Sequence, residues 1–280
     1  MMTLQHDLAR LDRIGLMGDV HADVDHVIAA TAMFHRKVIR VIVQLGDFGL
    51  VGRRAGTEQN LGRLEQHLRE HGQILFFVDG NHEDFSRLAE YPVSADGVRW
   101  IRRNLGHLPR GYRTTLTHGR KLAVLGGANS VDVRRRRPGI SWWEQEQITD
   151  DDLQKLGTEH TDILLAHDAP LHVPSLDASL QRSDKYWTDP ELTYAQRGRS
   201  MFHRGFLQVQ PQLTICGHYH QFIDETIEYE TEDGPFTSRV IVLDQQGKRR
   251  NCGILTPETL NVEVLDIDGN PCAEGTPHGN

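Results

Sequence analysis

Short apolar runs alternate with longer amphipathic stretches along most of the chain, and five of these runs end at residues of metal-binding type. This alternation is typical of strands separated by helices and predicts an α/β fold. Neighbouring glycines let the backbone turn sharply where a strand ends. The five polar segments are, in order, Gly18-Asp19-Val20-His21, Gly46-Asp47, Gly80-Asn81-His82-Glu83, His167 and Gly217-His218-Tyr219-His220. Because such strand ends converge on one edge of a sheet, we expect these segments to meet.

The first part of the chain has the pattern of two βαβ units. Apolar runs predict strands at 13–17, 38–45 and 73–78, and the stretches between them predict helices at 23–35 and 58–71. In the second helix, Leu61, Leu64 and Leu68 have helical spacing, and Gly72 ends the helix. Each of the three strands leads into one of the polar segments.

Beyond residue 92 the apolar runs become shorter, and no obvious crossover helices lie between them. This pattern predicts that the second half of the chain is more antiparallel. Helices are expected from near Thr149 and over 191–208, the second of them after a polar segment with Pro170 and Pro174. A single domain over 1–268 is the simplest account, followed by a flexible tail at 269–280. The expected strands are 98–101, 112–117, 121–125, 161–166, 211–215 and 260–267, with a hairpin of 221–230 and 236–243.

The composition is that of a globular protein, with 38% hydrophobic and 25% charged residues in 280. Cys216, Cys252 and Cys272 form no CxxC pair, which favours a reducing compartment. The N-terminal segment lacks the apolar core of a secretory signal, and no apolar stretch approaches the roughly 20 residues that cross a bilayer. We therefore expect a cytoplasmic protein with no membrane partner. The net charge of −8 argues against sequence-independent binding of nucleic acid by overall electrostatic attraction.

The polar segments together contain enough donors for two metal ions. Two divalent ions about 3.5–4 Å apart need a bridging carboxylate and further oxygen and nitrogen donors. These donors include no thiolate, which suits Mn²⁺, with Fe, Zn²⁺ or Ni²⁺ as alternatives, and disfavours Ca²⁺. Asp47 is the natural bridge; Asp19, His21 and His220 suit one ion, and Asn81, His167 and His218 suit the other.

Such a centre can hold a phosphate oxygen and lower the pKa of a bound water until hydroxide attacks phosphorus in line with the leaving oxygen. His82 lies between a predicted ligand and an acid along the chain, so its side chain is expected to face the substrate. There it could stabilise the transition state or protonate the leaving alkoxide, which makes it the predicted catalytic residue. The adjacent Glu83 and Asp84 are expected to be first-turn helix charges rather than ligands.

These motifs, in this order, resemble those of the calcineurin-like metallophosphoesterases. The resemblance spans Asp19 to His220 and rests on GDVH, GD, GNHE, a single His and GHYH. It implies a four-layer αββα sandwich, with two mixed sheets flanked by helices. It also implies a dinuclear centre bridged by Asp47, with the ligands named above.

One position departs from the family pattern. Many members have an aspartate three residues after the bridging one, where it orients the motif histidine, but this chain has Leu50 there. The partner of His82 is therefore not identified by the sequence.

A run of four arginines offers a candidate substrate-binding segment. Arg134, Arg135, Arg136 and Arg137 could bind an anionic substrate beside the metals, although a solvated loop is the commoner reason for such a run. Trp142 and Trp143 could stack on a base or anchor the loop to the core.

Three functions agree with these features. The favoured one is a metal-dependent phosphodiesterase or phosphatase acting on a small phosphoester, with a nucleotide or cyclic nucleotide as a candidate substrate. A nuclease or an end-processing phosphatase for nucleic acids is the second, although the acidic net charge disfavours it. The third is a non-catalytic metal-binding scaffold on the same fold, which metal content and the loss of activity on substituting Asp47 would distinguish from an enzyme.

Overall fold

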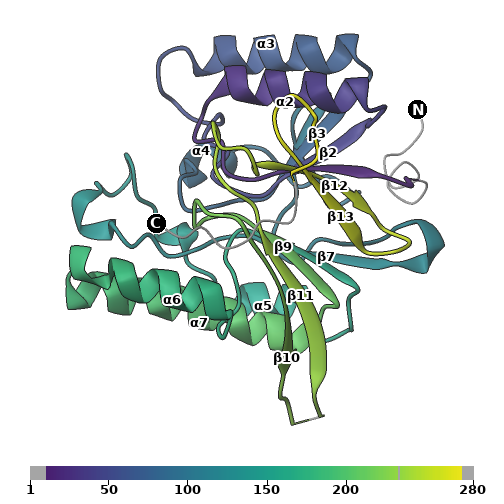
Figure 1. Ribbon diagram of the computed structural model, residues 1–280. Helices are drawn as coiled ribbons and strands as arrows, with labels where there is room; N and C mark the ends of the chain where they lie inside the picture. Colours follow the sequence, from purple (N-terminus) through teal and green to yellow (C-terminus); the bar gives the residue numbers. More distant parts are fainter. Residues whose placement is uncertain (1–10, 233, 273–280) are drawn as a thin grey trace.

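The computed structural model describes residues 11–232 and 234–272, which form two β-sheets packed face to face and covered by helices on both outer sides (Figure 1). The predicted αββα sandwich is thereby confirmed. In these described residues, no helix is long and apolar enough to cross a bilayer.

The first sheet has seven strands and carries three of the polar segments. Strands β1, β2 and β3 run parallel in its centre, and β12 joins β1 in antiparallel orientation. In spatial order the strands are β13 (Asn261–Leu265), β12 (Cys252–Thr256), β1 (Ile14–Met17), β2 (Val41–Gln44), β3 (Ile74–Phe77), β5 (Leu105–His107) and β4 (Arg99–Arg102).

The second sheet has six strands and carries the two remaining polar segments. Its strands β7, β8, β9 and β11 are parallel, and antiparallel pairing is limited to the outer strands β6 and β10. In spatial order the strands are β10 (Ile223–Tyr229), β11 (Phe236–Val242), β9 (Leu213–Cys216), β8 (Ile163–Ala166), β7 (Lys121–Leu125) and β6 (Arg113–Thr115).

Helices cover the outer face of each sheet. Near the first sheet lie α2 (Val24–Arg36), α3 (Thr57–Glu70) and the short α4 (Phe85–Leu88), and against the second lie α5 (Asp150–Leu156), α6 (Pro174–Ser183) and α7 (Asp189–Val209) (Figure 1). The connecting segments contain the 3₁₀ turns η1 (Thr117–Gly119), η2 (Val133–Arg135), η3 (Glu144–Glu146) and η4 (Asp184–Tyr186).

The alternation of side chains along each strand builds three apolar layers. Ile14 and Leu16 of β1 point into the layer between the sheets, whereas Met17 joins the layer beneath α2 and α3. A third layer lies between the second sheet and its helices, where Phe202 and Phe206 of α7 are fully buried. Parallel strands buried on both faces explain why the runs read as continuous apolar segments.

The second half of the chain is more antiparallel than the first, as expected, because β4–β5, β6–β7, β10–β11 and β12–β13 all pair antiparallel. Crossover helices were not expected there, yet α5 joins β7 to β8, and α6 and α7 join β8 to β9, so these two pairs are parallel. The elements α6, β5 and β12 were not expected either. Helix α6 begins at Pro174, which fits the first helical position although the residue reads as a helix breaker. Strands β5 and β12 depend on pairing with distant partners, β3 and β1, which a local pattern does not reveal.

The C-terminal segment returns to the first sheet. In the expected tail at 269–280, Cys272 N donates a hydrogen bond to Val264 O, and Pro271 forms a bridge with Leu265. Residues 273–280 lie outside the described residues. Cys216, Cys252 and Cys272 are all free thiols.

Candidate metal centre

The ends of five strands from both sheets converge on one group of side chains. Asp19 and His21 follow β1, Asp47 follows β2, and Asn81 and His82 follow β3 in the first sheet. His167 directly follows β8, and His218 and His220 follow β9 in the second sheet. The structure therefore brings all seven predicted ligands to the edge where the two sheets meet.

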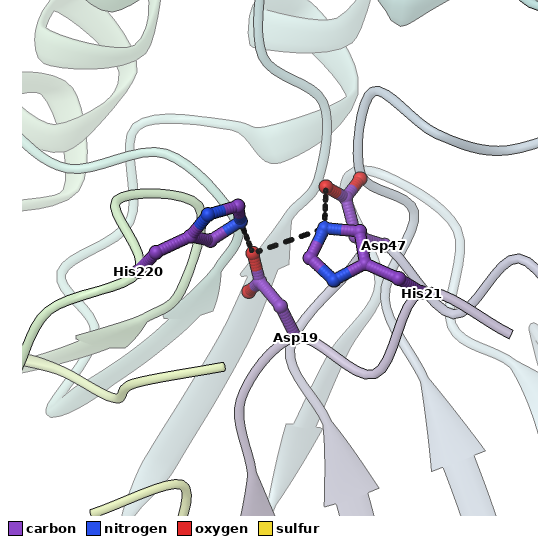
Figure 2. Close-up of side chains that lie close together, drawn as sticks. All are labelled: Asp19, His21, Asp47 and His220. Atoms are coloured by element: carbon purple, nitrogen blue, oxygen red, sulfur yellow. Dashed lines mark ion pairs between the residues drawn. The ribbon is translucent and has the colours of Figure 1, made fainter. Parts of the chain in front are cut away.

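The first group of candidate ligands is Asp19, His21, Asp47 and His220 (Figure 2). Each offers one donor atom, and these atoms all lie within 4.8 Å of one another. His220 Nε2 is 3.1 Å from Asp19 Oδ2, and His21 Nε2 is 3.4 Å from Asp47 Oδ2.

The second group consists of Asp47, His167 and His218, again with donor atoms within 4.8 Å of one another. Asn81 adjoins it, because its Oδ1 lies 3.1 Å from His167 Nε2. Asp47 belongs to both groups: its Oδ2 faces His21, and its Oδ1 lies 3.3 Å from His167 Nε2. A carboxylate shared in this way has the position required of a bridge between two ions.

The surroundings of His167 fit a cation. Its Nδ1 donates a hydrogen bond of 2.8 Å to Leu45 O, so a neutral ring presents the lone pair of Nε2 to the oxygens of Asn81 and Asp47. Acceptors facing acceptors need a proton or a metal ion between them. Burial lowers the pKa of His167, but the charge and hydrogen bond of Asp47 outweigh burial and raise this pKa to about 10.

One oxygen of the other buried carboxylate, Asp19, lacks a hydrogen-bond partner. Asp19 Oδ2 is buried without a hydrogen bond, since His220 is near it in distance but not in hydrogen-bond geometry. Burial lowers the pKa of His21, yet the hydrogen bond and charge of Asp47 raise it to about 9. Both groups therefore concentrate negative charge that cations would neutralise, and the residues present fit metal ions.

Glycines next to the ligands are required by close packing of the loops. A Cβ atom at Gly80 would collide with the carboxylate and backbone nitrogen of Asp47, and one at Gly217 would collide with Asp19 Oδ1. Because glycine has no Cβ atom, the backbone at these positions can lie close to the two carboxylates. His82 N donates to Asp47 Oδ1 at 2.8 Å, and His218 N donates to Asp19 Oδ1 at 2.9 Å.

Several candidate ligands have strained backbones. Positive φ angles occur at His21 (42°), Asp47 (54°), His218 (70°) and His220 (52°), a region that non-glycine residues rarely occupy. Strain of this kind persists only where surrounding contacts impose it, and it concentrates at functional sites. The ligand loops are thus held in shape by the fold rather than by local preference.

Partners outside the centre orient its imidazoles. His21 Nδ1 lies 2.9 Å from Gln246 Oε1, a contact that reaches across 225 residues of the chain. Such contacts set which ring nitrogen faces a metal ion. Gln246 had no signal in the sequence, because it follows β11 in a loop that resembles no motif.

Glu83 is buried, in contrast to the exposed helix charge that its place in the sequence predicts. It is 1% exposed, and its carboxylate accepts hydrogen bonds from Phe48 N at 2.8 Å and Gly49 N at 3.1 Å. It therefore ties the loop after β3 to the loop that carries Asp47. Burial and then the charge of Asp47 raise its pKa to about 7. The expectation of a first-turn helix charge is wrong for Glu83, whereas Asp84 does cap α4 through Arg87 N.

Replacing Glu83 with alanine is expected to lower both stability and metal affinity. The free energy of unfolding should fall by about 2–4 kcal/mol, because two N–H groups lose their acceptor. Metal affinity should fall by about 10–100-fold, since the Asp47 loop loses its support. Urea denaturation and metal titration measure the two effects. The control Asp84→Ala should cost about 1 kcal/mol as a lost cap; equal metal affinity in both variants would contradict the role of Glu83.

The missing partner of His82 is supplied from a distant loop. Leu50, at the position where an aspartate was expected, is 2% exposed in the apolar layer beneath α2 and α3. Instead, Arg136 Nη2 lies 2.7 Å from His82 Nε2. The His82 side chain is 41% exposed, and its Nε2 is 3.8 Å from Asp47 Oδ2. Burial lowers the pKa of His82, and Arg136 adds to this effect against the attraction of Asp47.

The four arginines differ in burial and contacts. Arg136 contacts His82 beside the centre, and its side chain is 7% exposed. Arg134, Arg135 and Arg137 are exposed, and the Arg135 guanidinium lies over the Trp187 ring. Trp142 takes the anchoring role, because its Nε1 donates to Tyr194 OH of α7 at 3.3 Å.

A solved structure shares this fold at low sequence identity. The protein TT1561 of Thermus thermophilus matches with a TM-score of 0.51 and 11% identity, over 92% of this chain and 99% of that one. Two further matches have TM-scores below 0.5: an archaeal phosphodiesterase (0.42, 14% identity, 91% and 99% covered) and GAP50, an anchor in the inner membrane complex of Plasmodium (0.47, 13%, 92% and 86%). No curated protein matches the chain in sequence.

Family membership rests on the sequence profile. The profile of the calcineurin-like phosphoesterases matches residues 12–222, which include every candidate ligand from Asp19 to His220. The match covers well over half of the chain, and the two-sheet sandwich agrees with it. The chain therefore belongs to the calcineurin-like phosphoesterase family.

Proposed function

We propose that the protein is a metal-dependent phosphoesterase that hydrolyses phosphodiester or phosphomonoester bonds of small molecules such as nucleotides, at a centre for two divalent ions. The observation that carries the proposal is the position of Asp47 in both ligand groups. The remaining ligands of one ion would be Asp19, His21 and His220, and those of the other ion would be Asn81, His167 and His218.

The proposed metals follow from the donor atoms. Carboxylate, amide and imidazole donors without thiolate suit Mn²⁺, and Fe, Zn²⁺ and Ni²⁺ fit the same set. When bound, two such ions supply Lewis-acid activation of water and neutralise charge on the phosphate. The chain itself contributes a rigid set of ligands. Glu83 binds the backbone of the Asp47 loop, and Gly80 and Gly217 allow the ligand loops to pack closely.

His82 is the proposed catalytic side chain. It is more exposed than the buried ligands, and its ring stands edge-on to His21 with centroids 5.2 Å apart. Its backbone nitrogen holds Asp47, so the ring is directed by the same loop that positions the bridge. From there it can hold a proton at Nε2 for the oxygen that leaves phosphorus.

Hydrolysis of model esters tests the proposal. Protein loaded with Mn²⁺ is expected to cleave p-nitrophenyl phosphate, bis(p-nitrophenyl) phosphate or both, with rates that follow metal content. A panel of nucleotides, cyclic nucleotides and short oligonucleotides then ranks substrate classes. If the protein retains bound metal and cleaves neither ester, hydrolysis is contradicted and the non-catalytic scaffold is favoured.

A further inference from the structure

We propose that Arg136 is a phosphate-binding residue of this centre, and that it makes the site prefer terminal phosphomonoesters over diesters. The inference rests on the proposed function for its location and concerns a side chain outside the ligand set. Arg136 touches His82 and the backbone of Asn81, so it adjoins the same loop that carries the ligand and the catalytic residue.

Three contacts hold the guanidinium in one orientation. Nε donates to Asp132 Oδ1 at 2.6 Å, Nη1 donates to Asn81 O at 3.0 Å, and Nη2 faces His82 Nε2 at 2.7 Å. The side chain is 7% exposed, so little conformational freedom remains to be lost when an anion binds.

The loop that carries Arg136 is itself fastened to the centre. Asn81 Nδ2 donates to Ser130 Oγ at 3.1 Å, and Glu146 accepts from Ser130 N at 2.8 Å and from Tyr194 OH at 3.0 Å. Ser130 and Glu146 are both buried. The loop before Arg136 therefore shares a hydrogen-bond network with a predicted metal ligand, which is how a binding residue is held in place.

The contact between Arg136 and His82 is itself suited to an anion. Arg136 Nη2 lies 2.7 Å from His82 Nε2, so the guanidinium borders the ring that is proposed to contact the leaving oxygen. A guanidinium carries five N–H groups, and the three contacts named above use three of them. Two N–H groups therefore remain to donate to an anion bound beside His82.

The charge of Arg136 selects among phosphoesters. A terminal phosphate carries about −1.5 to −2 charges near neutral pH and three acceptor oxygens. A diester carries one charge and two free oxygens. A fixed guanidinium therefore adds more binding energy to the monoester, and arginine is the side chain whose planar donors match phosphate best.

Substitution of Arg136 tests this preference. Arg136→Met keeps the apolar stem and removes the charge. We expect it to lower kcat/KM for p-nitrophenyl phosphate by about 10–100-fold, the range for a charged hydrogen bond, and for bis(p-nitrophenyl) phosphate by much less. Inorganic phosphate, titrated calorimetrically into the metal-loaded protein, should bind more weakly by a similar factor.

Arg134→Met is the matched control. Arg134 is exposed on the same loop, and its charge acts on Glu191 at the start of α7. This variant changes the net charge equally and should leave the monoester-to-diester ratio and the phosphate affinity unchanged. Equal effects of the two substitutions, or an unchanged ratio in Arg136→Met, would overturn the proposal.

Two further outcomes remain informative. If Arg136→Met does not fold, Arg136→Gln decides, because it removes the charge and keeps a polar group that can donate to Asn81 O; a wild-type ratio in that variant overturns the proposal. If the unmodified protein cleaves neither ester, the proposed hydrolytic function is contradicted. The phosphate titration still tests whether Arg136 binds phosphate. Undiminished phosphate affinity in Arg136→Met would then reject its role.

Discussion

Asp47→Asn is expected to lower kcat/KM by at least about 10³-fold and to reduce the metal content per chain, under the proposed mechanism. The substitution keeps the shape of the side chain but removes the one charge that both ligand groups share. It also weakens the acceptor for His82 N, so the catalytic loop loses its anchor to the bridge. Ester hydrolysis and elemental analysis of the purified protein measure the two effects.

Asp23→Asn is the matched control for this substitution. Asp23 caps α2 by accepting from His26 N at 2.9 Å, a role that asparagine performs equally well. It changes the same charge in the neighbouring loop, and activity and metal content should stay at the wild-type level. Retention of full metal content by Asp47→Asn, with activity within tenfold of the wild type, would rule out a bridging role.

Removal of metal is expected to abolish hydrolysis and to make folding stability fall as pH rises from 7 to 10. In the metal-free protein, His21 and His167 bind protons in place of ions, with pKa values of about 9 and 10. Because these values lie above the unfolded value of 6.5, the stability they contribute is complete below pH 6.5 and is lost as pH rises through 9 and 10. Bound ions would replace these protons and remove the dependence.

Thermal unfolding at pH 7, 8.5 and 10, with and without chelator, measures this effect. The metal-free protein should lose about 5 °C or more in Tm over this range beyond any loss in the loaded protein. Starting at pH 7 leaves out Glu83, whose raised pKa of about 7 places its own loss of stability between pH 4.5 and 7. Parallel pH curves for the two forms would contradict the pairing of histidines with buried carboxylates, and Asp47→Asn should flatten the metal-free curve.

The candidate ligands were readable from the sequence because their signals are local. Asp19, Asp47 and His167 each follow an apolar run of strand length, and a glycine precedes two of them. Strand ends of parallel sheets lie on one edge, so a local pattern predicts a spatial group. The hairpin of β10 and β11 was predictable for the same reason, since both strands and their turn are contiguous.

The supporting residues were decided by tertiary structure alone. Arg136 meets His82 across 54 residues, and Gln246 meets His21 across 225. Neither residue type nor spacing marks such a contact, because it arises only when two loops pack together. Glu83 was not predictable for the same reason. An acid at the start of a helix is ordinarily a solvated charge, whereas Glu83 is buried and binds the backbone of the Asp47 loop.

The sequence by itself therefore determined the fold class, the family and the group of candidate ligands. It could do so because each apolar run is followed directly along the chain by its turn residues and donor side chains. Only the tertiary structure decided which of four arginines faces the centre. Arg136 differs from Arg134, Arg135 and Arg137 in burial and contacts, and these depend on how the loop folds against Asn81 rather than on the residue itself.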